Sequence, residues 1–285
     1  MNTILLDGKL LASKLKEKLA AEIAHLKSST GQVPRVVSVM VGDDPAGLSY
    51  ISSQQRAADS LGIHYEVQHV AAVTSQEDVL ELIDQLNSFE HVHGVIINKP
   101  LPAHLDFNTL INAVTADKDI EGMNLTNLGR LFLGANKIIP CTPASVMAHL
   151  HSTGVSLKGK EAVIIGRSDI VGKPLALLLL QEHVTVTICH SATLNLEEHV
   201  KRADIVIAAI GQPLFVRGSW VKEGAIVIDV GINRVADKIV GDVDFPSVSL
   251  KSSFITPVPG GVGPVTSVML MHNACEAFKV QIQSI

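Results

Sequence analysis

Charged residues and cysteines are scarce in this chain of 285 residues. Charged side chains make up 18% and the formal net charge is −5, so the sequence offers no basic surface of the kind that nucleic acids bind. The cysteines, Cys141, Cys189 and Cys275, stand far apart and form no C-x-x-C pair, which excludes the common zinc-finger and thioredoxin-like motifs. Such sparse cysteines favour a reducing, cytoplasmic compartment.

Long hydrophobic runs are also missing. No apolar run approaches the roughly 18 residues of a membrane-spanning helix, and the N-terminal stretch, with early acidic residues and no small-residue cleavage site, does not resemble a signal peptide. The twelve histidines include pairs two residues apart, at 91 and 93 and at 149 and 151, but no H-E-x-x-H motif accompanies them. We therefore expect no membrane partner and no metal site.

What the chain does contain is a regular alternation of apolar segments. In the first half, apolar spacing predicts helices at 8–29, 47–61 and 77–87 and strands at 35–41, 63–70 and 93–98. In the second half, nearly unbroken apolar runs predict strands at 161–166, 183–190, 203–211, 224–231 and 253–261. Alternating strands and helices are typical of α/β proteins with parallel sheets.

The alternation is interrupted once, near residues 138–160, where prolines precede a predicted helix. We predict two α/β domains with a cleft between them. Residues 1–140 plus 265–285 form an N-terminal catalytic domain, and residues 141–264 form a Rossmann-type, parallel-sheet dinucleotide domain. The final helix, at 265–279, lies beyond the last strand of the dinucleotide-type sheet, so we expect it to pack back on the first domain.

The stretch IIGRSDIVGKP, residues 164–174, joins a predicted strand to a predicted helix. The usual dinucleotide fingerprint is G-x-G-x-x-G, whereas here Gly166 is followed by Ser168, and the next glycine, Gly172, comes one residue late. A strand that ends at glycine and a helix with Pro174 in its first turn still match a phosphate-binding turn, because free N–H groups at a helix start bind phosphate. The alternative is a plain strand–helix corner.

The end of the next predicted strand favours the phosphate-binding interpretation and indicates which dinucleotide binds. NAD sites usually place an acidic residue about 20 residues further on, where it binds the ribose 2′-hydroxyl. Residues 188–193 (ICHSAT) contain no acid. Arg167 stands in the loop instead and offers a positive charge for a 2′-phosphate. The sequence therefore predicts NADP as the cofactor.

Motifs in both halves resemble those of one enzyme family. Along the chain they read VGDDPAGLSY, NKPLP, DKDIEGMN, NLGRL, PCTP, GRSDIVGKP, VTICHSAT, ADIVIAAIGQP, VIDVGIN, GDVDF and TPVPGGVGPVT. Together they span nearly the whole chain and resemble the methylenetetrahydrofolate dehydrogenase/cyclohydrolase family. The resemblance implies a homodimer of two-domain α/β subunits with folate in the cleft. It also implies oxidation of methylenetetrahydrofolate to methenyltetrahydrofolate with NADP, followed by hydrolysis to formyltetrahydrofolate.

The resemblance also implies site residues. It places the catalytic residues at Tyr50, Gln54, Asn98 and Glu121. It places substrate contacts at Tyr50, Asn98, Pro100, Leu101, Glu121, Pro259, Gly260 and Gly261, with Tyr50 stacking near the folate and Glu121 anchoring its pterin. It places cofactor contacts at Gly166, Arg167, Ser168, Gly172, Lys173, Pro174, His190, Ser191, Gly211 and Ile232.

Most of the catalytic positions depart from the family pattern. The family has a lysine four residues after the tyrosine, on the same helical face, where this chain has Gln54. The family stretch Q-L-P-L-P reads NKPLP here, so Asn98 replaces a glutamine. The stretch K-D-x-D-G reads KDIEG, so Glu121 replaces an aspartate. Coordinated changes in one site indicate altered chemistry or an altered substrate.

The two family reactions make different demands on these positions. Hydride transfer needs the reacting carbons held in line, and no side chain has to exchange a proton. Hydrolysis needs a group that takes a proton from water and delivers one to the leaving nitrogen, which a lysine can do and an amide cannot. The sequence therefore predicts weak or absent cyclohydrolase activity, unless Lys99, expected on the opposite face of the strand from Asn98, turns into the site.

Two other functions are left open by the sequence. A diverged relative could act on a different folate or pterin, or transfer the folate one-carbon unit to another acceptor. A non-catalytic folate- or nucleotide-binding protein could retain the fold, although such a protein would not need the segments GRSDIVGKP and GGVG.

Overall fold

The computed structural model describes residues 3–282, which divide into two compact units. The three-stranded unit consists of residues 15–141 and 267–282, and the six-stranded unit of residues 3–14 and 142–266. Two long helices, α1 (Gly8–Thr30) and α10 (Val262–Ile282), contribute residues to both units. No helix within residues 3–282 is long and apolar enough to cross a membrane.

The three-stranded unit is built on a parallel sheet in the order β3-β2-β4. Its strands are β2 (Arg35–Val41), β3 (His64–Val70) and β4 (Gly94–Ile97), close to the predicted ranges. Every residue of β2 after the first is buried, which is typical of a central parallel strand covered on both faces. The helices of this unit are α2 (Pro45–Asp59), α3 (Gln76–Ser88), α4 (Phe107–Ala113) and α5 (Leu125–Phe132).

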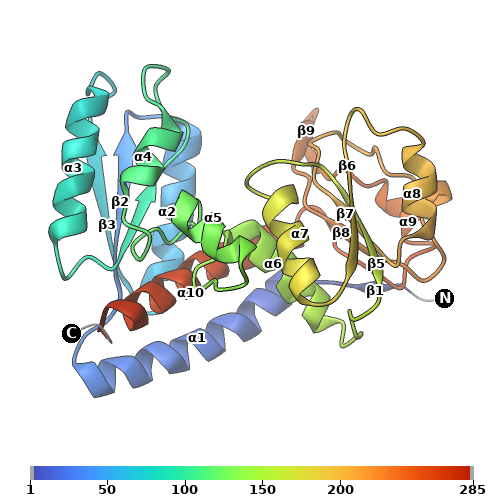
Figure 1. Cartoon of the computed structure of the whole chain (residues 1–285), viewed down its shortest axis with the longest axis horizontal. Coiled ribbons are helices and arrows are strands. Elements are labelled where there is room, and N and C mark those ends of the chain that lie inside the picture. Colours follow the sequence, from blue (N-terminus) through green and yellow to red (C-terminus); the bar gives the residue numbers. More distant parts are fainter. Residues whose placement is uncertain (1–2, 283–285) are drawn as a thin grey trace. The chain divides into compact units, whose positions relative to one another are not determined.

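Helices α3 and α4 pack over one face of this sheet (Figure 1), where Ile83 and Leu110 enter a core shared with β2 and β4. The predicted start of α3 is confirmed, because the Ser75 hydroxyl oxygen accepts a hydrogen bond from the Asp78 backbone N–H. The sequence analysis did not predict α4 and α5. Both are short and capped by Asp106 and Asn124, side chains that also occur in ordinary loops.

The six-stranded unit is an open sheet in the order β1-β11-β8-β7-β5-β6, with every pair of neighbouring strands parallel. Its strands are β1 (Ile4–Leu5), β5 (Glu161–Ile165), β6 (Thr185–Cys189), β7 (Ile205–Ala208), β8 (Ile226–Asp229) and β11 (Phe254–Ile255). Each run predicted as a strand in the second half contains a strand, while β1 was not predicted. The prediction for 253–261 was wrong over most of its length, because only Phe254–Ile255 is a strand and the prolines and glycines that follow form a loop. The expected two-domain α/β architecture with parallel sheets is therefore confirmed.

The order of this sheet creates a switch point at β5. The chain passes from β5 to β6 on one side and then crosses to β7 on the other, and ligands of open α/β sheets bind at the carboxyl ends of the strands at such a point. Around the sheet lie α6 (Cys141–Ser152), α7 (Gly172–Gln181), α8 (Leu196–Arg202), η1 (Gly218–Trp220) and α9 (Phe245–Val248).

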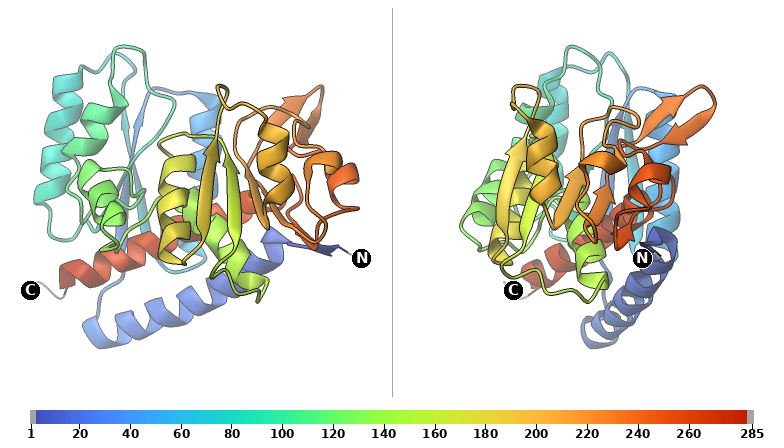
Figure 2. Two further views of the ribbon diagram at one scale, coloured as in Figure 1. Left: turned by 45° about the vertical axis from the view of Figure 1, so that its right-hand side comes forward. Right: turned by 90° about the vertical axis from the view of Figure 1, so that its right-hand side faces the viewer.

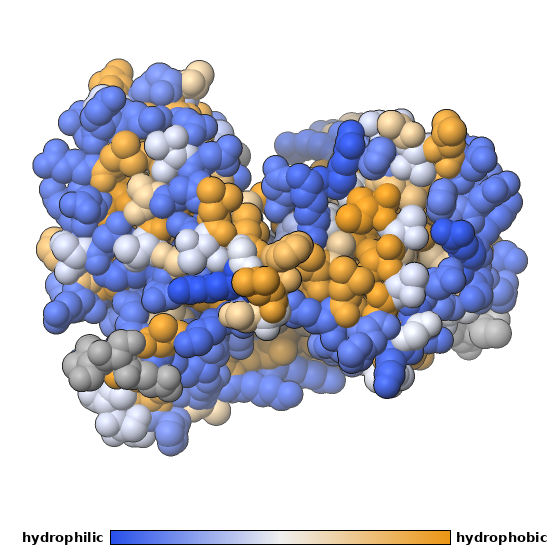
Figure 3. Space-filling view, viewed as in Figure 1, coloured by the Kyte–Doolittle hydropathy of each residue, from blue (hydrophilic) through white to orange (hydrophobic). Residues whose placement is uncertain are grey.

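Two surface features of this unit lie away from the switch point. A hairpin of β9 (Asn233–Val235) and β10 (Lys238–Val240) projects from it (Figure 2). Apolar side chains reach the surface over β6, the outer strand, where Ile188 is exposed (Figure 3). Neither feature alters the switch point, which carries the first candidate site.

Candidate functional site

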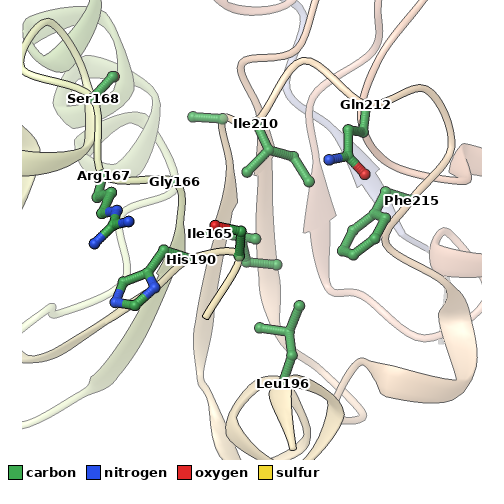
Figure 4. A pocket seen from close by; sticks show the side chains of 11 residues that line it. Ile165, Gly166, Arg167, Ser168, His190, Leu196, Ile210, Gln212 and Phe215 are labelled. Atoms are coloured by element: carbon green, nitrogen blue, oxygen red, sulfur yellow. The ribbon is translucent and has the colours of Figure 1, made fainter. Parts of the chain in front are cut away.

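A pocket of about 540 Å³ opens at the switch point of the six-stranded sheet. Figure 4 shows the side chains of Arg167 and His190 on one side and those of Gln212 and Phe215 on the other. The pocket is lined by Ile165, Gly166, Arg167, Ser168, His190, Ser191, Leu196, Ala209, Ile210, Gln212 and Phe215. The fold therefore brings together half of the predicted cofactor residues, namely Gly166, Arg167, Ser168, His190 and Ser191.

The glycines between β5 and α7 allow backbone segments to approach closely. Gly166 has φ +128°, and a Cβ atom there would lie 2.3 Å from the carbonyl oxygen of Ala209. A Cβ atom on Gly172 would lie 2.2 Å from the carbonyl oxygen of Gly166. Within the described chain, Val171 at the start of α7 makes no side-chain cap bond. The Lys173 N–H donates to the carbonyl oxygen of Ser168 at 3.1 Å and Pro174 has no N–H, which leaves the Gly172 N–H in the first turn of α7 for a phosphate.

The electrostatics of the pocket favour an anion. No acidic residue is among the lining residues in the described part of the chain, so the Arg167 guanidinium has no carboxylate partner in the pocket. The Ser168 hydroxyl oxygen accepts a 3.2 Å hydrogen bond from Val171 N–H, which leaves the hydroxyl proton to donate. His190 Nδ1 accepts from Ala192 N–H at 3.2 Å. Together these groups suit a phosphate better than a neutral ribose hydroxyl.

The remaining predicted cofactor residues do not line the pocket; they are Gly172, Lys173, Pro174, Gly211 and Ile232. Lys173 is paired with Asp169 at 2.5 Å. The N–H of Gly211 donates to Asp242 Oδ2 at 3.0 Å, which ties down the loop after β7. Ile232 is 71% exposed. The contacts of these residues with a ligand stay a prediction.

The sequence analysis missed several lining residues, including Leu196, Gln212 and Phe215. Leu196 opens α8, and Gln212 and Phe215 belong to the loop after β7. Their residue types carry no cofactor signal of their own. The predicted strand ends could have identified them, because loops that follow neighbouring parallel strands meet at one edge of a sheet.

A second set of predicted residues lies in the three-stranded unit, around Gln54 of α2. Gln54 is 1% exposed, and the Tyr65 hydroxyl on β3 donates a 2.5 Å hydrogen bond to Gln54 Oε1. Gln54 Nε2 is buried and makes no hydrogen bond of normal length among the described residues, while the Gln54 amide lowers the pKa of the nearby Tyr50 hydroxyl. Because an unpaired buried donor is costly, this group is an open position for a ligand.

Asn98 directly follows β4 and is 4% exposed. Its Nδ2 donates to Ser38 Oγ at 2.5 Å and to the carbonyl oxygen of Val39 at 2.9 Å. Its Oδ1 is buried and lacks a hydrogen-bond partner within residues 3–282. Asn98 therefore offers an acceptor where Gln54 offers a donor.

Glu121 stands in a turn that Asp119 fixes. The Asp119 carboxylate accepts hydrogen bonds from the backbone N–H groups of Gly122 at 3.1 Å and Asn124 at 2.7 Å. Glu121 Oε2 is buried and has no hydrogen-bond partner in the described chain. Burial raises the pKa of Glu121 to about 7, the charge of Asp119 also raises it, and the charge of Lys99 lowers it. Glu121 therefore changes its charge near neutral pH.

Tyr50 and Lys99 border this cluster. Tyr50 is 45% exposed, and burial around its hydroxyl together with the charge of Glu121 raises its pKa, so the phenol stays neutral. Asn98 is buried and Lys99 is exposed, and both follow the last residue of β4, Ile97. Lys99 Nζ lies 3.9 Å from the centroid of the Phe107 ring, a cation–π contact that holds the ammonium against α4.

The other predicted substrate residues fall in both units. Pro100 and Leu101 follow Lys99 after β4, in the three-stranded unit. Pro259, Gly260 and Gly261 belong to the six-stranded unit, in the loop between β11 and α10. That loop is held against the start of α1, because Gly8 N–H donates to the carbonyl oxygen of Gly260 at 2.8 Å.

Ser38 and Tyr65 are the residues of this cluster that the sequence analysis missed. Ser38 stands in RVVSVMV, an otherwise apolar stretch apart from its first residue, and is 0% exposed. A hydroxyl in the middle of a buried strand needs a partner, so the interruption itself was a usable signal. Tyr65 gave no comparable signal, because tyrosine is common in strands.

Comparisons with known proteins identify the family of this chain. Residues 6–121 match the model of the tetrahydrofolate dehydrogenase/cyclohydrolase catalytic domain, and residues 140–282 match that of the NAD(P)-binding domain of the same family. The bifunctional protein FolD of Streptococcus gordonii is 49% identical over 281 residues, which cover 98% of this chain and 99% of that protein. The FolD protein of Bacillus pumilus is 45% identical over 280 residues, with 98% and 99% covered.

Solved structures give the same result. The bifunctional FolD enzyme of Campylobacter jejuni superposes with a TM-score of 0.95 at 44% identity, covering 98% of this chain and 99% of that chain. The Trypanosoma brucei FolD enzyme, solved with NADP and an inhibitor, superposes with a TM-score of 0.93 at 36% identity and 99% coverage of both chains. With both family models matched and these relatives aligned end to end, the chain belongs to the tetrahydrofolate dehydrogenase/cyclohydrolase family, an enzyme family with an NAD(P)-binding domain.

Proposed function

We propose that this protein is an NADP-dependent methylenetetrahydrofolate dehydrogenase whose methenyltetrahydrofolate cyclohydrolase activity is weak or absent. The observation that carries the proposal is Gln54, a buried amide at the position where the family resemblance implies a lysine. The relatives are named as bifunctional. The function proposed for this protein differs from theirs in the second step, the hydrolysis of methenyltetrahydrofolate. Folate is assigned to the predicted domain 1–140 plus 265–285, and NADP to the predicted domain 141–264.

On the folate side, the proposal assigns hydrogen bonds to Gln54, Asn98 and Glu121 and ring contacts to Tyr50, Pro100 and Leu101. The unpaired buried atoms of the first three support it, because a polar ligand would supply the missing partners. Pro259, Gly260 and Gly261, in the six-stranded unit, stay predicted substrate residues. Hydride transfer asks only that these groups hold the methylene carbon in place.

On the cofactor side, NADP fits the pocket at the switch point. Bound NADP accepts the hydride, and the residues of this chain bind and orient it. We assign the 2′-phosphate to Arg167, helped by Ser168 and Ser191, and further cofactor contacts to Gly166, His190 and the surrounding predicted residues. The absence of acidic lining residues in the described chain supports NADP over NAD.

Hydrolysis lacks a lysine in this site. Gln54 cannot exchange a proton at neutral pH, Tyr50 is held neutral by its raised pKa, and Lys99 is engaged with Phe107. Glu121, with a pKa of about 7, is a group of the predicted folate site that could accept or deliver a proton. Any residual hydrolysis is therefore assigned to Glu121, and Glu121→Gln would remove it.

The test measures both steps with purified protein. With NADP and methylenetetrahydrofolate, we expect NADPH and methenyltetrahydrofolate to form together. We expect the methenyl absorbance then to decay at the rate seen without enzyme. Gln54→Lys should raise the hydrolysis rate, and Gln54→Lys combined with Asn98→Gln should raise it further, toward the 10²–10⁴-fold typical of general acid–base catalysis.

Gln55→Lys is the matched control, because it adds the same charge at an exposed neighbouring position of α2. It should leave hydrolysis unchanged. Rapid hydrolysis by the natural protein would contradict the proposed loss of cyclohydrolase activity. No NADPH formation from methylenetetrahydrofolate would instead favour an altered substrate or a binding protein.

We further propose that the protein is a homodimer that works in the cytoplasm. The dimer is carried over from the family resemblance, and sedimentation velocity would test it by giving twice the mass of one chain. The reducing compartment is supported by the thiols of Cys141, Cys189 and Cys275, which lie in the described chain and form no disulfide there.

A further inference from the structure

A series of four buried side chains runs from Asn98 through Ser38 and Tyr65 to Gln54. Asn98 Nδ2 donates to Ser38 Oγ at 2.5 Å, and the Tyr65 hydroxyl donates to Gln54 Oε1 at 2.5 Å. Between these two bonds, the Ser38 hydroxyl acts on Tyr65 and lowers its pKa. All of these side chains are at most 8% exposed. The series joins β4, β2, β3 and α2 behind the two amides of the proposed folate site.

One backbone group fixes the orientation of the Asn98 amide. The carbonyl oxygen of Val39 can only accept, and Asn98 donates to it at 2.9 Å, so the nitrogen of the Asn98 amide must face inward. Ser38 Oγ accepts a second hydrogen bond from the same nitrogen. The Gln54 amide is oriented by a separate bond, because its Oε1 accepts from the Tyr65 hydroxyl. The Ser38 hydroxyl lowers the pKa of Tyr65 against the larger effect of burial.

These bonds fix which hydrogen-bonding atoms the two amides present to a ligand. With its nitrogen turned inward, Asn98 presents Oδ1, and with its oxygen bound by Tyr65, Gln54 presents Nε2. Both presented atoms are buried and without hydrogen-bond partners among the described residues. An amide free to rotate would present donor and acceptor interchangeably, and this site does not allow it.

We propose that Ser38 and Tyr65 are positioning residues of the substrate site, which lock Gln54 as a hydrogen-bond donor and Asn98 as a hydrogen-bond acceptor. The ligand that fits is a ring with a carbonyl oxygen for Gln54 and an N–H for Asn98, a pattern that the cyclic amide of a reduced pterin carries. The inference rests on the proposed function for the identity of this ligand. In this proposal, Gln54 binds the substrate through an amide of fixed orientation, at the position where the family has a lysine.

The test compares the natural protein with Tyr65→Phe and Ser38→Ala in the NADP-dependent oxidation of methylenetetrahydrofolate. Each change breaks the series without touching either amide. Loss of one oriented hydrogen bond should raise KM about five- to tenfold and change kcat less than twofold. Ser252→Ala is the matched control, because it removes another buried serine hydroxyl, in the six-stranded unit, and should leave KM unchanged.

A double-mutant cycle separates positioning from a general packing defect. If Tyr65 acts through the Gln54 amide, Tyr65→Phe should change KM less than twofold in a Gln54→Met background, which has no amide to orient. An equal KM effect in both backgrounds, or unchanged KM in Tyr65→Phe and Ser38→Ala, would overturn the proposal.

A measurement without substrate keeps this inference separate from the proposed function. In NMR spectra, the Tyr65 hydroxyl proton should exchange slowly with water, disappear in Tyr65→Phe and shift in Ser38→Ala. If the natural protein does not oxidise methylenetetrahydrofolate, the proposed function fails while a slowly exchanging proton still supports the series. A proton that exchanges rapidly in the natural protein overturns the series, whatever the activity.

Discussion

At the scale of single residues, Glu121 of the proposed folate site links the stability of the protein to pH. Burial is the main reason that the pKa of the Glu121 carboxyl is raised from its ordinary value of 4.5 to about 7. Between these two pH values the carboxyl is protonated in the folded protein and ionised in the unfolded chain. The free energy of unfolding therefore falls as pH rises from about 4.5 to about 7. Above that range the buried charge destabilises the fold by a constant amount.

We predict that Glu121→Gln stabilises the protein at pH 8 by about 1–2 kcal/mol and has little effect at pH 4, because it removes a charge that is partly desolvated. Urea unfolding at the two pH values measures the difference. Glu90→Gln, at an exposed position of the same unit, should show no such pH dependence.

A second variant tests the binding role of the same residue. We predict that Glu121→Ala loses tetrahydrofolate binding, while its NADP binding stays intact. A Glu121→Ala variant with unchanged folate affinity would reject the assignment.

Arg167 is the corresponding residue of the cofactor pocket. We predict that Arg167→Ala weakens NADP binding by about 1.5–3 kcal/mol, the typical size of one hydrogen bond to a charged group, and leaves NAD binding nearly unchanged. Calorimetric titration with each cofactor measures the two effects. Arg234→Ala removes the same charge from the β9–β10 hairpin and serves as the control. Equal affinity of the natural protein for NADP and NAD would show that Arg167 does not read the 2′-phosphate.

At the scale of elements, the β5–turn–α7 unit depends on how closely its backbone segments pack. Gly166 combines a φ of +128° with an approach of 2.3 Å to the Ala209 carbonyl oxygen for any added Cβ. Gly159 also has a positive φ, of +77°, but an added Cβ there meets nothing within 4 Å. Substitution of these two glycines therefore distinguishes two effects. Backbone strain would arise at both positions, and steric exclusion of the added Cβ only at Gly166.

We predict that Gly166→Ala lowers the free energy of unfolding by about 2–4 kcal/mol, since it adds both strain and a clash. It should also abolish NADP binding, because β5 and β7 must separate to admit the methyl group. Gly159→Ala carries strain alone, so it should cost about 1 kcal/mol and leave NADP affinity unchanged. Thermal unfolding with and without NADP gives both quantities. If the two variants behaved alike, steric exclusion at Gly166 would be refuted.

At the scale of the whole molecule, stability at acid pH depends on a buried histidine of the three-stranded unit, which contacts both β2 and α10. His93 is 4% exposed, its Nδ1 accepts from Arg35 N–H at 3.0 Å, and its ring packs edge-on against Phe278 of α10. Burial, with help from the charge of Lys118, lowers the pKa of His93 to about 4. The folded protein therefore keeps this ring neutral at pH values where the unfolded chain protonates it.

We predict that His93 makes the free energy of unfolding fall as pH drops from about 6.5 to about 4, by roughly 3 kcal/mol in total, with no further contribution outside this range. His93→Gln should lack this part of the acid sensitivity. His91→Gln, at an exposed site two residues earlier, should retain it. Urea unfolding across pH 4–7 decides the matter, and parallel pH profiles for the natural protein and His93→Gln would contradict the prediction.

Much of the fold and of the predicted cofactor site could be predicted, because the signals for both come from residues that are close together in the sequence. Apolar runs such as 205–208, buried on both faces, identify parallel strands, and a glycine at the end of β5 followed by a helix start identifies a phosphate-binding turn. Elements with weak patterns were missed. The pairing of β1 with β11 rests on contacts between Ile4 and Phe254, which lie at opposite ends of the chain.

By itself, then, the sequence determined the α/β class, the family and the residue types of both sites, including the amide at position 54. Only the tertiary structure decided which atoms those residues present. Asn98 meets Ser38 across 60 positions of sequence, and Tyr65 reaches Gln54 from a neighbouring strand. The physical reason is that an amide carries a donor and an acceptor on one planar group, and only its buried neighbours, brought together by folding, fix which of the two faces the substrate.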